Sequence, residues 1–326
     1  MRWWGVNEKR EQISKGVYWG RRIIGPVTPL QRYIAEEIAT DHVDGLLSRR
    51  EAMRRLALLG VGASAATALI AACGSNPAQP APSSTETATP AAAPPGMDTA
   101  LETTAISWAG LKGELQGAWA QAAEPKGAIL VIHENKGLND WVRSVAGRLA
   151  GVGYSSLAID LLSENGGTAT FADPAEATAA LGNRAPEDMV ADLKSGLGEV
   201  AARTPGAKVA AVGFCMGGGL VWRLLAAGTP ELAAAFPFYG PTPDDPDFAG
   251  SKDVAVLGFY GELDQRVNAT EPVARAALER AGLVHELVTE PGANHAFFND
   301  TGDRYDPGAA ADAWRRTLDW LSAHVG

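Results

Sequence analysis

The sequence has few of the features that would define a disulfide-rich, nucleic-acid-binding or membrane-spanning protein. It contains only two cysteines, Cys73 and Cys215, in 326 residues, so no disulfide framework can hold the fold together. Its formal net charge is −10, and its second half has no basic tract, which argues against a nucleic-acid surface. A small-molecule substrate is therefore the better expectation.

Long apolar runs are also absent. Leu56–Ala72 is apolar but rich in Ala and Gly, and it is short of the roughly 20 residues that a membrane-spanning helix needs. An arginine-rich segment, residues 48–55, precedes this run, and small residues end it. This order is typical of an export signal. An uncleaved membrane anchor is the alternative. A buried helix of a soluble domain is disfavoured, because nothing nearby in the sequence supplies the rest of a core.

Two short motifs refine the interpretation of residues 48–73 as an export signal. Arg49-Arg50 resembles a twin-arginine signal, although Ala52 stands where that motif usually has a bulky apolar residue. The sequence IAAC, ending at Cys73, resembles a lipobox, in which the cysteine is lipidated and becomes the new N-terminus. We therefore expect an exported protein, anchored to the membrane on its extracytoplasmic side.

The segments around this signal do not have the pattern of a catalytic fold. Residues 1–47 form a leader of unknown role, with a modest amphipathic stretch at Pro29–Leu47. Residues 74–96 are Pro, Ala, Ser and Thr with almost no large apolar side chain, so they cannot bury enough surface to offset their ordering entropy. We expect a disordered tether that leads to a catalytic domain at residues 97–326.

The catalytic segment alternates strand and helix patterns. Strands are predicted at Ala128–Ile132, Ser156–Ile159, Val209–Phe214, Ala233–Tyr239, Val254–Tyr260 and Glu286–Thr289. Helices are predicted at Trp141–Ala150, Pro186–Ala202, Gly217–Ala227, Glu271–Ala281 and Ala309–His324. Fully apolar strands that alternate with helices indicate an α/β fold, a mostly parallel sheet with helices on both faces. Residues 106–120, with a turn at Gly113, are expected to add an antiparallel hairpin at its edge.

One strand leads directly into the sequence GFCMGG at residues 213–218, and a helix follows. This is the cysteine form of a nucleophile elbow, a sharp strand-to-helix turn in which side chains at Gly213 or Gly217 would collide with the neighbouring turn. The helix N-terminus favours a Cys215 thiolate, and the Met216 N–H would point at a developing oxyanion. The alternative is a buried structural cysteine in a glycine-rich turn.

Candidate partners for Cys215 follow it in the chain. Asp264 comes just after a predicted strand, and His295 lies in a loop between the last strand and the last helix. The order nucleophile, acid, base is the one expected of an α/β-hydrolase. A carboxylate beside His295 would fix its tautomer. Asp264 could instead cap the following helix, and Glu262 is the competing acid.

The other histidines are assigned to other places. His42 precedes the export signal, whereas His285 and His324 are expected on the surface. His133 follows the first parallel strand, and its loop borders the active site in this architecture.

Several motifs together resemble the dienelactone hydrolases, also called carboxymethylenebutenolidases. They are GFCMGG (213–218), YGELDQRV (260–267), NHAFFN (294–299), VIHENKGLN (131–139), RLA (148–150), GY (153–154) and AIDL (158–161). The resemblance covers residues 103–326 and implies the α/β-hydrolase fold in one catalytic domain.

The resemblance also implies roles that the residues alone do not. Glu134 corresponds to a glutamate that holds the cysteine as a thiol at rest and moves away when substrate arrives, and the Asn135 N–H corresponds to the second oxyanion donor. The best-known members bind a substrate carboxylate through two arginines. Here Asn299 stands at one of these positions, and residues 162–165 lack the other. Another lactone or a carboxylic ester is therefore the expected substrate.

These observations predict a monomeric hydrolase that cleaves a small-molecule ester or lactone through Cys215, His295 and Asp264, with a thioester intermediate. We expect no cofactor, no metal and no nucleic acid, and contact with the membrane only through the N-terminal lipid or anchor. Two other classes stay open: a lipid-anchored binding protein with little turnover, and a redox protein that uses Cys215. The second lacks a nearby resolving cysteine.

Overall fold

The computed structural model describes residues 28–74 and 93–326, so the predicted leader at 1–27 and most of the predicted tether fall outside the described residues. The described chain groups into two compact units. One unit contains residues 93–172 and 184–326, and the other contains residues 28–74 together with 173–183. The larger unit carries the hydrolase-like motifs and is described first.

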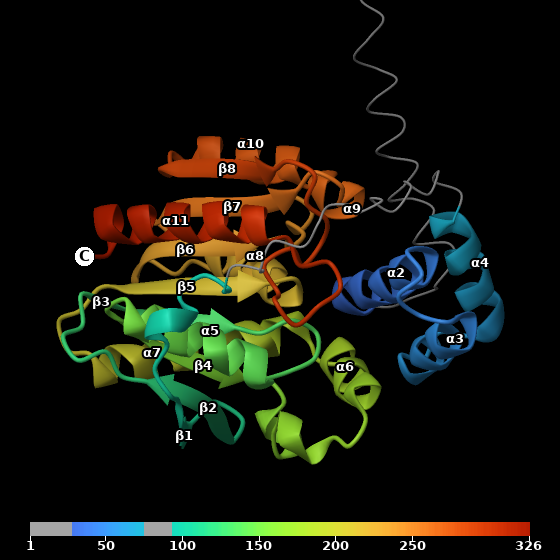
Figure 1. Cartoon of the computed structure of the whole chain (residues 1–326), viewed down its shortest axis with the longest axis horizontal. Helices are drawn as coiled ribbons and strands as arrows, with labels where there is room; N and C mark the ends of the chain where they lie inside the picture. Colours follow the sequence, from blue (N-terminus) through green and yellow to red (C-terminus); the bar gives the residue numbers. More distant parts are fainter. Residues whose placement is uncertain (1–27, 75–92) are drawn as a thin grey trace, which may run out of the picture. The chain divides into compact units, whose positions relative to one another are not determined.

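The larger unit is built on one eight-stranded sheet with the strand order β1-β2-β4-β3-β5-β6-β7-β8 (Figure 1). Its strands are β1 Thr104–Ala109, β2 Glu114–Ala120, β3 Gly127–Ile132, β4 Tyr154–Asp160, β5 Val209–Phe214, β6 Leu232–Phe238, β7 Ala255–Gly261 and β8 His285–Glu290. Strands β3 to β8 are parallel, while β2 pairs antiparallel with both β1 and β4. The predicted parallel sheet and its edge hairpin are confirmed.

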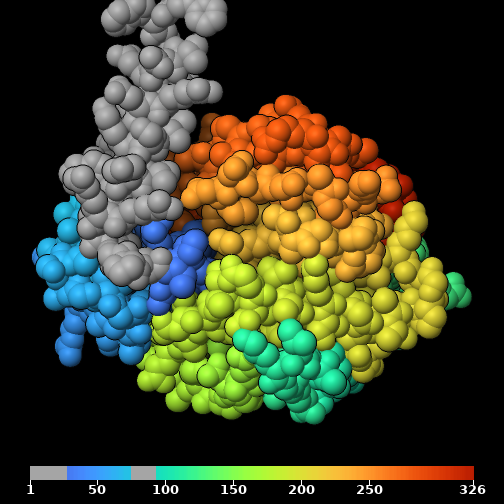
Figure 2. All heavy atoms as spheres, turned by 180° about the vertical axis from the view of Figure 1, so that it is seen from behind, coloured from blue at the N-terminus to red at the C-terminus, as the bar shows by residue number. Residues whose placement is uncertain are grey.

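Helices cover both faces of this sheet. They are α5 Asp140–Gly151, α7 Pro186–Arg203, α8 Met216–Ala226, the short α9 Gln265–Asn268, α10 Glu271–Ala281 and α11 Pro307–His324. Helices α5 and α11 cross the near face in Figure 1, and α7 and α8 lie behind the sheet. Seen from behind, the β1–β2 hairpin lies at one edge of this unit and α10 at the other, as the strand order requires (Figure 2).

The strands of the sheet centre are buried on both faces. Every residue of β3, β4, β5 and β7 is buried, which is why β3, β5 and β7 have continuous apolar runs rather than alternating patterns. Parallel strands place all their carboxyl ends at one edge of the sheet, and the loops at that edge carry the ligand site in open α/β folds. Residues 133–135, 215 and 264 follow directly at that edge.

The smaller unit consists of α2 Pro29–Val43, α3 Arg49–Leu58, α4 Ala63–Cys73 and α6 Pro174–Gly182, which contact one another. Helix α6 lies within the predicted catalytic segment but groups with the N-terminal helices. Gly60, with φ of 81°, lies in the turn that separates α3 from α4. The apolar run Leu56–Ala72 is therefore two short helices with partners in α2 and α6, contrary to our argument that no core was available for it.

Among the helices of residues 28–74 and 93–326, none combines the length and apolar character that crossing a bilayer requires. Export and lipidation at Cys73 stay predictions.

Candidate active site

Cys215 lies at a strained turn between β5 and α8. Its φ is 56° and its ψ is −116°, a backbone conformation that non-glycine residues rarely adopt. A Cβ on Gly213 would lie 2.2 Å from the Gly217 carbonyl oxygen, and a Cβ on Gly217 would lie 2.5 Å from that of Ile132. The predicted need for glycine at both positions is confirmed. The turn therefore has the geometry of a nucleophile elbow.

The elbow also determines what surrounds the sulfur. Met216 is the first residue of α8, and the first four N–H groups of a helix have no acceptor within the helix. The Cys215 N–H donates to the Phe238 carbonyl at 3.1 Å, which anchors the turn to β6. Cys215 is 1% exposed. The positive end of the helix dipole favours a thiolate at this sulfur, whereas burial favours the neutral thiol.

His295 and Asp264 form the hydrogen-bonded pair that the chain order predicts. His295 Nδ1 lies 2.5 Å from Asp264 Oδ2, and both side chains are buried. The Cys215 sulfur and a ring nitrogen of His295 lie within 4.8 Å of each other. Asp264 is also the N-cap of α9, because its Oδ1 accepts the Val267 N–H at 3.2 Å. Both interpretations of this aspartate, as orienting acid and as helix cap, thus describe one carboxylate with two partners.

The electrostatics of the pair favour an ionised Asp264. Burial would raise its pKa, but the neighbouring His295, the hydrogen bond between them and the charge of Arg266 together hold the pKa of Asp264 below its usual value. A carboxylate that stays ionised orients the imidazole and stabilises its protonated form. The competing acid Glu262 is exposed, and its Oε2 accepts the Gly292 N–H at 2.7 Å.

Glu134 is buried at the carboxyl end of β3, with partners from two other loops. Its Oε2 accepts a hydrogen bond from Asn299 Nδ2 at 2.8 Å, and its Oε1 lies 3.5 Å from the Tyr239 hydroxyl, which donates to it. The amide oxygen of Asn299 accepts from both the N–H and the hydroxyl of Thr301, so the amide nitrogen must face Glu134. The sequence singled out Asn299 only as a missing arginine, and its contact with Glu134 was not predicted.

Tyr239 was missed as a site residue because it was predicted to be the last residue of the strand Ala233–Tyr239. It follows β6, has a φ of 36°, and packs its ring on His295 with the ring centroids 5.2 Å apart. Burial, followed by the neighbouring Glu134 carboxyl and Cys215, raises the pKa of Tyr239 well above its usual value. Its position just beyond the strand next to β5 was the available signal.

An aromatic cluster supports these groups from within the sheet and its near-face helices. Phe214 stacks on Phe298 at 5.6 Å and meets Trp141 edge-on at 5.0 Å between ring centroids. Phe297 contacts Tyr239 edge-on at 5.3 Å. The residues beside Cys215 and His295 are therefore held by large apolar side chains, which limits their motion.

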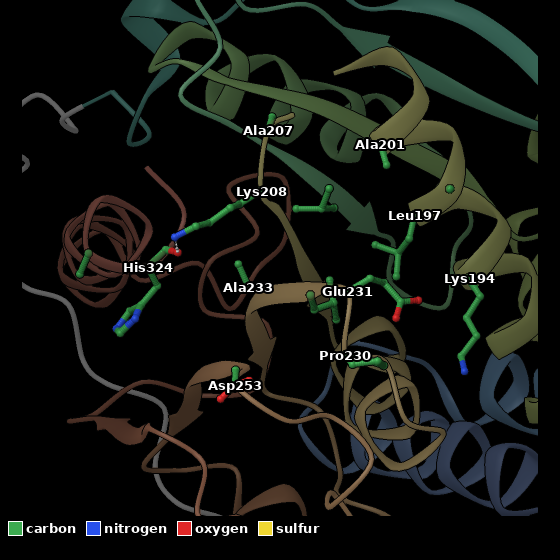
Figure 3. A pocket seen from close by; sticks show the side chains of 14 residues that line it. Lys194, Leu197, Ala201, Ala207, Lys208, Pro230, Glu231, Ala233, Asp253 and His324 are labelled. Atoms are coloured by element: carbon green, nitrogen blue, oxygen red, sulfur yellow. Dashed lines mark hydrogen bonds between the residues drawn. The ribbon is translucent and has the colours of Figure 1, made fainter. Parts of the chain in front are cut away.

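A hollow of about 840 Å³ lies away from these residues, at the amino ends of β5 and β6 (Figure 3). Lys208 at this hollow donates to the His324 carbonyl at 3.0 Å, and Lys194 donates to the carbonyls that end α8, at Ala227 and Gly228. These lysines neutralise helix C-termini. Because β5 separates the hollow from Cys215, the candidate chemistry lies at the opposite edge of the sheet.

Comparisons with known proteins match the larger unit. The model of the dienelactone hydrolase family matches residues 115–325. A protein of Escherichia coli O157:H7 assigned as a carboxymethylenebutenolidase is 32% identical over 219 residues, covering 63% of this chain and 80% of that protein. A relative from Saccharolobus solfataricus with the same assignment is 31% identical over 237 residues, covering 62% and 91%.

Two solved structures extend this similarity to the fold. One, assigned as a dienelactone hydrolase from Klebsiella pneumoniae, has a TM-score of 0.60 at 27% identity and covers 69% of this chain and 100% of that chain. The other is a dienelactone hydrolase-like promiscuous phosphotriesterase from metagenomic libraries, with a TM-score of 0.61 at 26% identity, covering 70% and 100%. Together with the cysteine elbow and the order of the site residues, these matches show that the chain belongs to the dienelactone hydrolase family.

Proposed function

We propose that this protein hydrolyses a lactone or carboxylic ester through Cys215, with His295 and Asp264 as its partners. The observation that carries the proposal is the strained elbow at Cys215 facing a buried His295–Asp264 pair. A structural cysteine has no need of strained backbone, and a filler residue has no need of an oriented imidazole.

The reaction follows from the groups at this edge of the sheet. His295 takes the proton of the Cys215 thiol as the sulfur attacks the ester carbonyl carbon, and the carbonyl electron pair moves to oxygen, where the Met216 and Asn135 N–H groups hold it. The intermediate then expels the alkoxide, which takes a proton from the His295 imidazolium and leaves a thioester on Cys215. His295 removes a proton from water as the water attacks this thioester. The resulting intermediate expels the Cys215 sulfur, which takes the proton back from His295, so the thiol is regenerated and the carboxylic acid is released.

Glu134 is proposed to keep the sulfur protonated at rest, the role that the family resemblance implies. The support is its buried carboxylate, which accepts hydrogen bonds from Asn299 and from Tyr239. A conditional thiolate is protected from oxidation, to which a permanently ionised thiolate is open.

A neutral substrate is proposed, because neither position at which the best-known family members carry a substrate-binding arginine holds one here. Asn299 is neutral and bonded to Glu134. Arg184 reaches the Leu161 carbonyl at the end of β4, but its guanidinium also pairs with Asp192 at 2.8 Å and with Glu164 at 3.1 Å. A substrate carboxylate would compete with these two anions for Arg184, which disfavours an anionic dienelactone.

The test is hydrolysis of p-nitrophenyl acetate, a neutral lactone panel and a phosphotriester by the wild type and by Cys215→Ala. We expect ester and lactone turnover to fall by roughly 10⁴–10⁶-fold in the variant. A p-nitrophenyl ester should also acylate Cys215 in the wild type, which mass spectrometry would detect. Undiminished turnover in the variant would reject Cys215 as the nucleophile, and a wild type that binds esters without acylation would identify a binding protein.

Export stays a separate proposal. The basic, apolar and IAAC sequence order at residues 48–73 supports a lipidated N-terminus at Cys73. Mass spectrometry of the mature N-terminus, from membranes and from soluble fractions, tests it directly.

A further inference from the structure

His133 is a fully buried histidine with no assigned part in the chemistry, yet both of its ring nitrogens have backbone partners. Its Nε2 lies 3.1 Å from the Leu161 backbone nitrogen, and its Nδ1 lies 2.6 Å from the Glu134 carbonyl oxygen. A backbone N–H can only donate and a carbonyl can only accept. The ring must therefore be neutral, with its proton on Nδ1. Burial, which lowers the pKa of His133, favours the same neutral form.

The bond to the Glu134 carbonyl orients the next N–H group. The Glu134 carbonyl and the Asn135 N–H belong to one peptide unit, which is planar and trans, so they point in opposite directions. The His133 ring reaches Leu161, which follows β4, so the carbonyl is held on the β4 side of β3. Because the strand order is β4-β3-β5, the Asn135 N–H is directed towards the β5 side, where Cys215 lies.

The elbow packs against the same turn from the other side. A Cβ on Gly217 would lie 2.7 Å from the His133 carbonyl oxygen, so α8 approaches the backbone that leads into Glu134. The Gly137 N–H also donates to the Glu134 carbonyl, but at 3.4 Å, which leaves His133 as its closer donor.

We propose that His133 is a positioning residue that locks the Glu134–Asn135 peptide with its N–H towards the oxyanion of the acyl-transfer reaction. The inference rests on the proposed function, because an oxyanion forms only if Cys215 attacks a carbonyl. Without the Nδ1 donor, the peptide can rotate, and its carbonyl can replace the N–H in the oxyanion site. Loss of one oxyanion donor typically lowers the rate by about 10²–10³-fold.

Two variants separate the two ring contacts. In His133→Asn, the amide nitrogen replaces Nδ1 and retains a donor for the Glu134 carbonyl. In His133→Gln, the longer amide reaches the Nε2 position and retains an acceptor for the Leu161 N–H while the Nδ1 donor is lost. Each variant would be compared with the wild type in two reactions of Cys215, acylation by p-nitrophenyl acetate and alkylation by iodoacetamide. Only acylation passes through an oxyanion.

We expect His133→Gln to slow acylation by about 10²–10³-fold while alkylation stays within about twofold, and His133→Asn to keep most of the acylation rate. Equal losses in both variants, or equal losses of acylation and alkylation, would show a merely structural role and overturn the inference. A wild type that is alkylated but never acylated would instead reject the proposed function. If a variant fails to fold, ¹⁵N NMR of the wild type decides, because a proton found on Nε2 of His133 contradicts the proposed lock.

Discussion

At the scale of single residues, the site depends on side chains that each hold two hydrogen-bond partners. Asp264 caps α9 through one oxygen and orients His295 through the other. Its pKa is held below the usual value, so its ionised form stabilises the folded state at every pH above the ordinary aspartate value of about 3.9. That contribution disappears as the pH falls through the lowered pKa, because the proton then removes the ion pair.

Asp264→Asn is the change that tests this carboxylate. An amide can donate to His295 Nδ1 and so favour the wrong tautomer, and we expect kcat to fall by about 10⁴-fold while the fold is kept. Glu262→Gln is the matched control, since Glu262 is exposed and accepts a hydrogen bond from the Gly292 backbone N–H; the turnover of this variant should stay within about twofold. Steady-state kinetics of both variants check this. A larger loss of turnover in Glu262→Gln than in Asp264→Asn would identify Glu262, rather than Asp264, as the acid that orients His295.

At the scale of elements, the reactive groups are positioned by strands and a helix whose backbones approach one another closely. The strand β5, the turn at Cys215 and the helix α8 fit together only because Gly213 and Gly217 lack side chains. The same contacts bring α8 against the carboxyl end of β3, where Glu134 and Asn135 lie. Strain at Cys215 is therefore maintained by packing on both neighbouring strands.

Gly217→Ala should break this approach. Its Cβ would lie 2.5 Å from a backbone carbonyl oxygen that cannot move without shifting β3, so we expect a loss of about 1–3 kcal/mol in the free energy of unfolding, and a loss of activity. Gly198→Ala is the control, because Gly198 is an exposed residue inside α7 with open space around its Cα. It should gain about 0.5–1 kcal/mol from helix propensity. Denaturant unfolding measures both, and a stable, active Gly217→Ala would contradict the elbow's packing requirement.

At the scale of the whole molecule, two segments distant in the chain share one small helical core. Arg54 pairs with Asp173 at 2.7 Å, and Gln31 donates to Asn183 at 2.7 Å. A Cβ on Gly182 would lie 2.6 Å from the Leu59 side chain, so α6 packs on the turn after α3. Cleavage before Cys73 would remove every one of these partners of α6. A mature protein that has been cleaved before Cys73 cannot retain this helical core. Export with cleavage and an intact core therefore exclude each other.

Leu59→Ala tests the shared core. Leu59 is 3% exposed, and its truncation should cost this unit about 2–5 kcal/mol. Hydrogen exchange should then accelerate together in residues 28–74 and in α6, while β3 to β7 stay protected. Leu58→Ala is the neighbouring control, with its side chain 37% exposed, and it should change little. Unchanged exchange in α6 after Leu59→Ala would mean that α6 does not depend on the N-terminal helices.

Much of the larger unit was predictable because its signals are local. Strands β3 to β8 and the helices between them were predicted to within a few residues, since most of these strands are buried on both faces and have largely apolar sequences. Helix α6 was not predicted, because Pro174–Gly182 is rich in Ala and has little amphipathic pattern. The packing partners of Leu56–Ala72 were also missed, because one of them, α6, lies more than 100 residues away in the chain.

The sequence by itself determined that Cys215 lies in a G-x-C-x-G elbow and that Asp264 and His295 follow in the order of an α/β-hydrolase. A short motif and the order of residues along the chain are enough to carry these two signals. Only the tertiary structure decided the partners of Glu134 and His133. The contacts from Asn299, Tyr239 and Leu161 come from three different loops, and no spacing along the chain encodes them. They exist because parallel strands bring their carboxyl ends to one edge of the sheet, where the order in space, β4-β3-β5-β6, differs from the order in the chain.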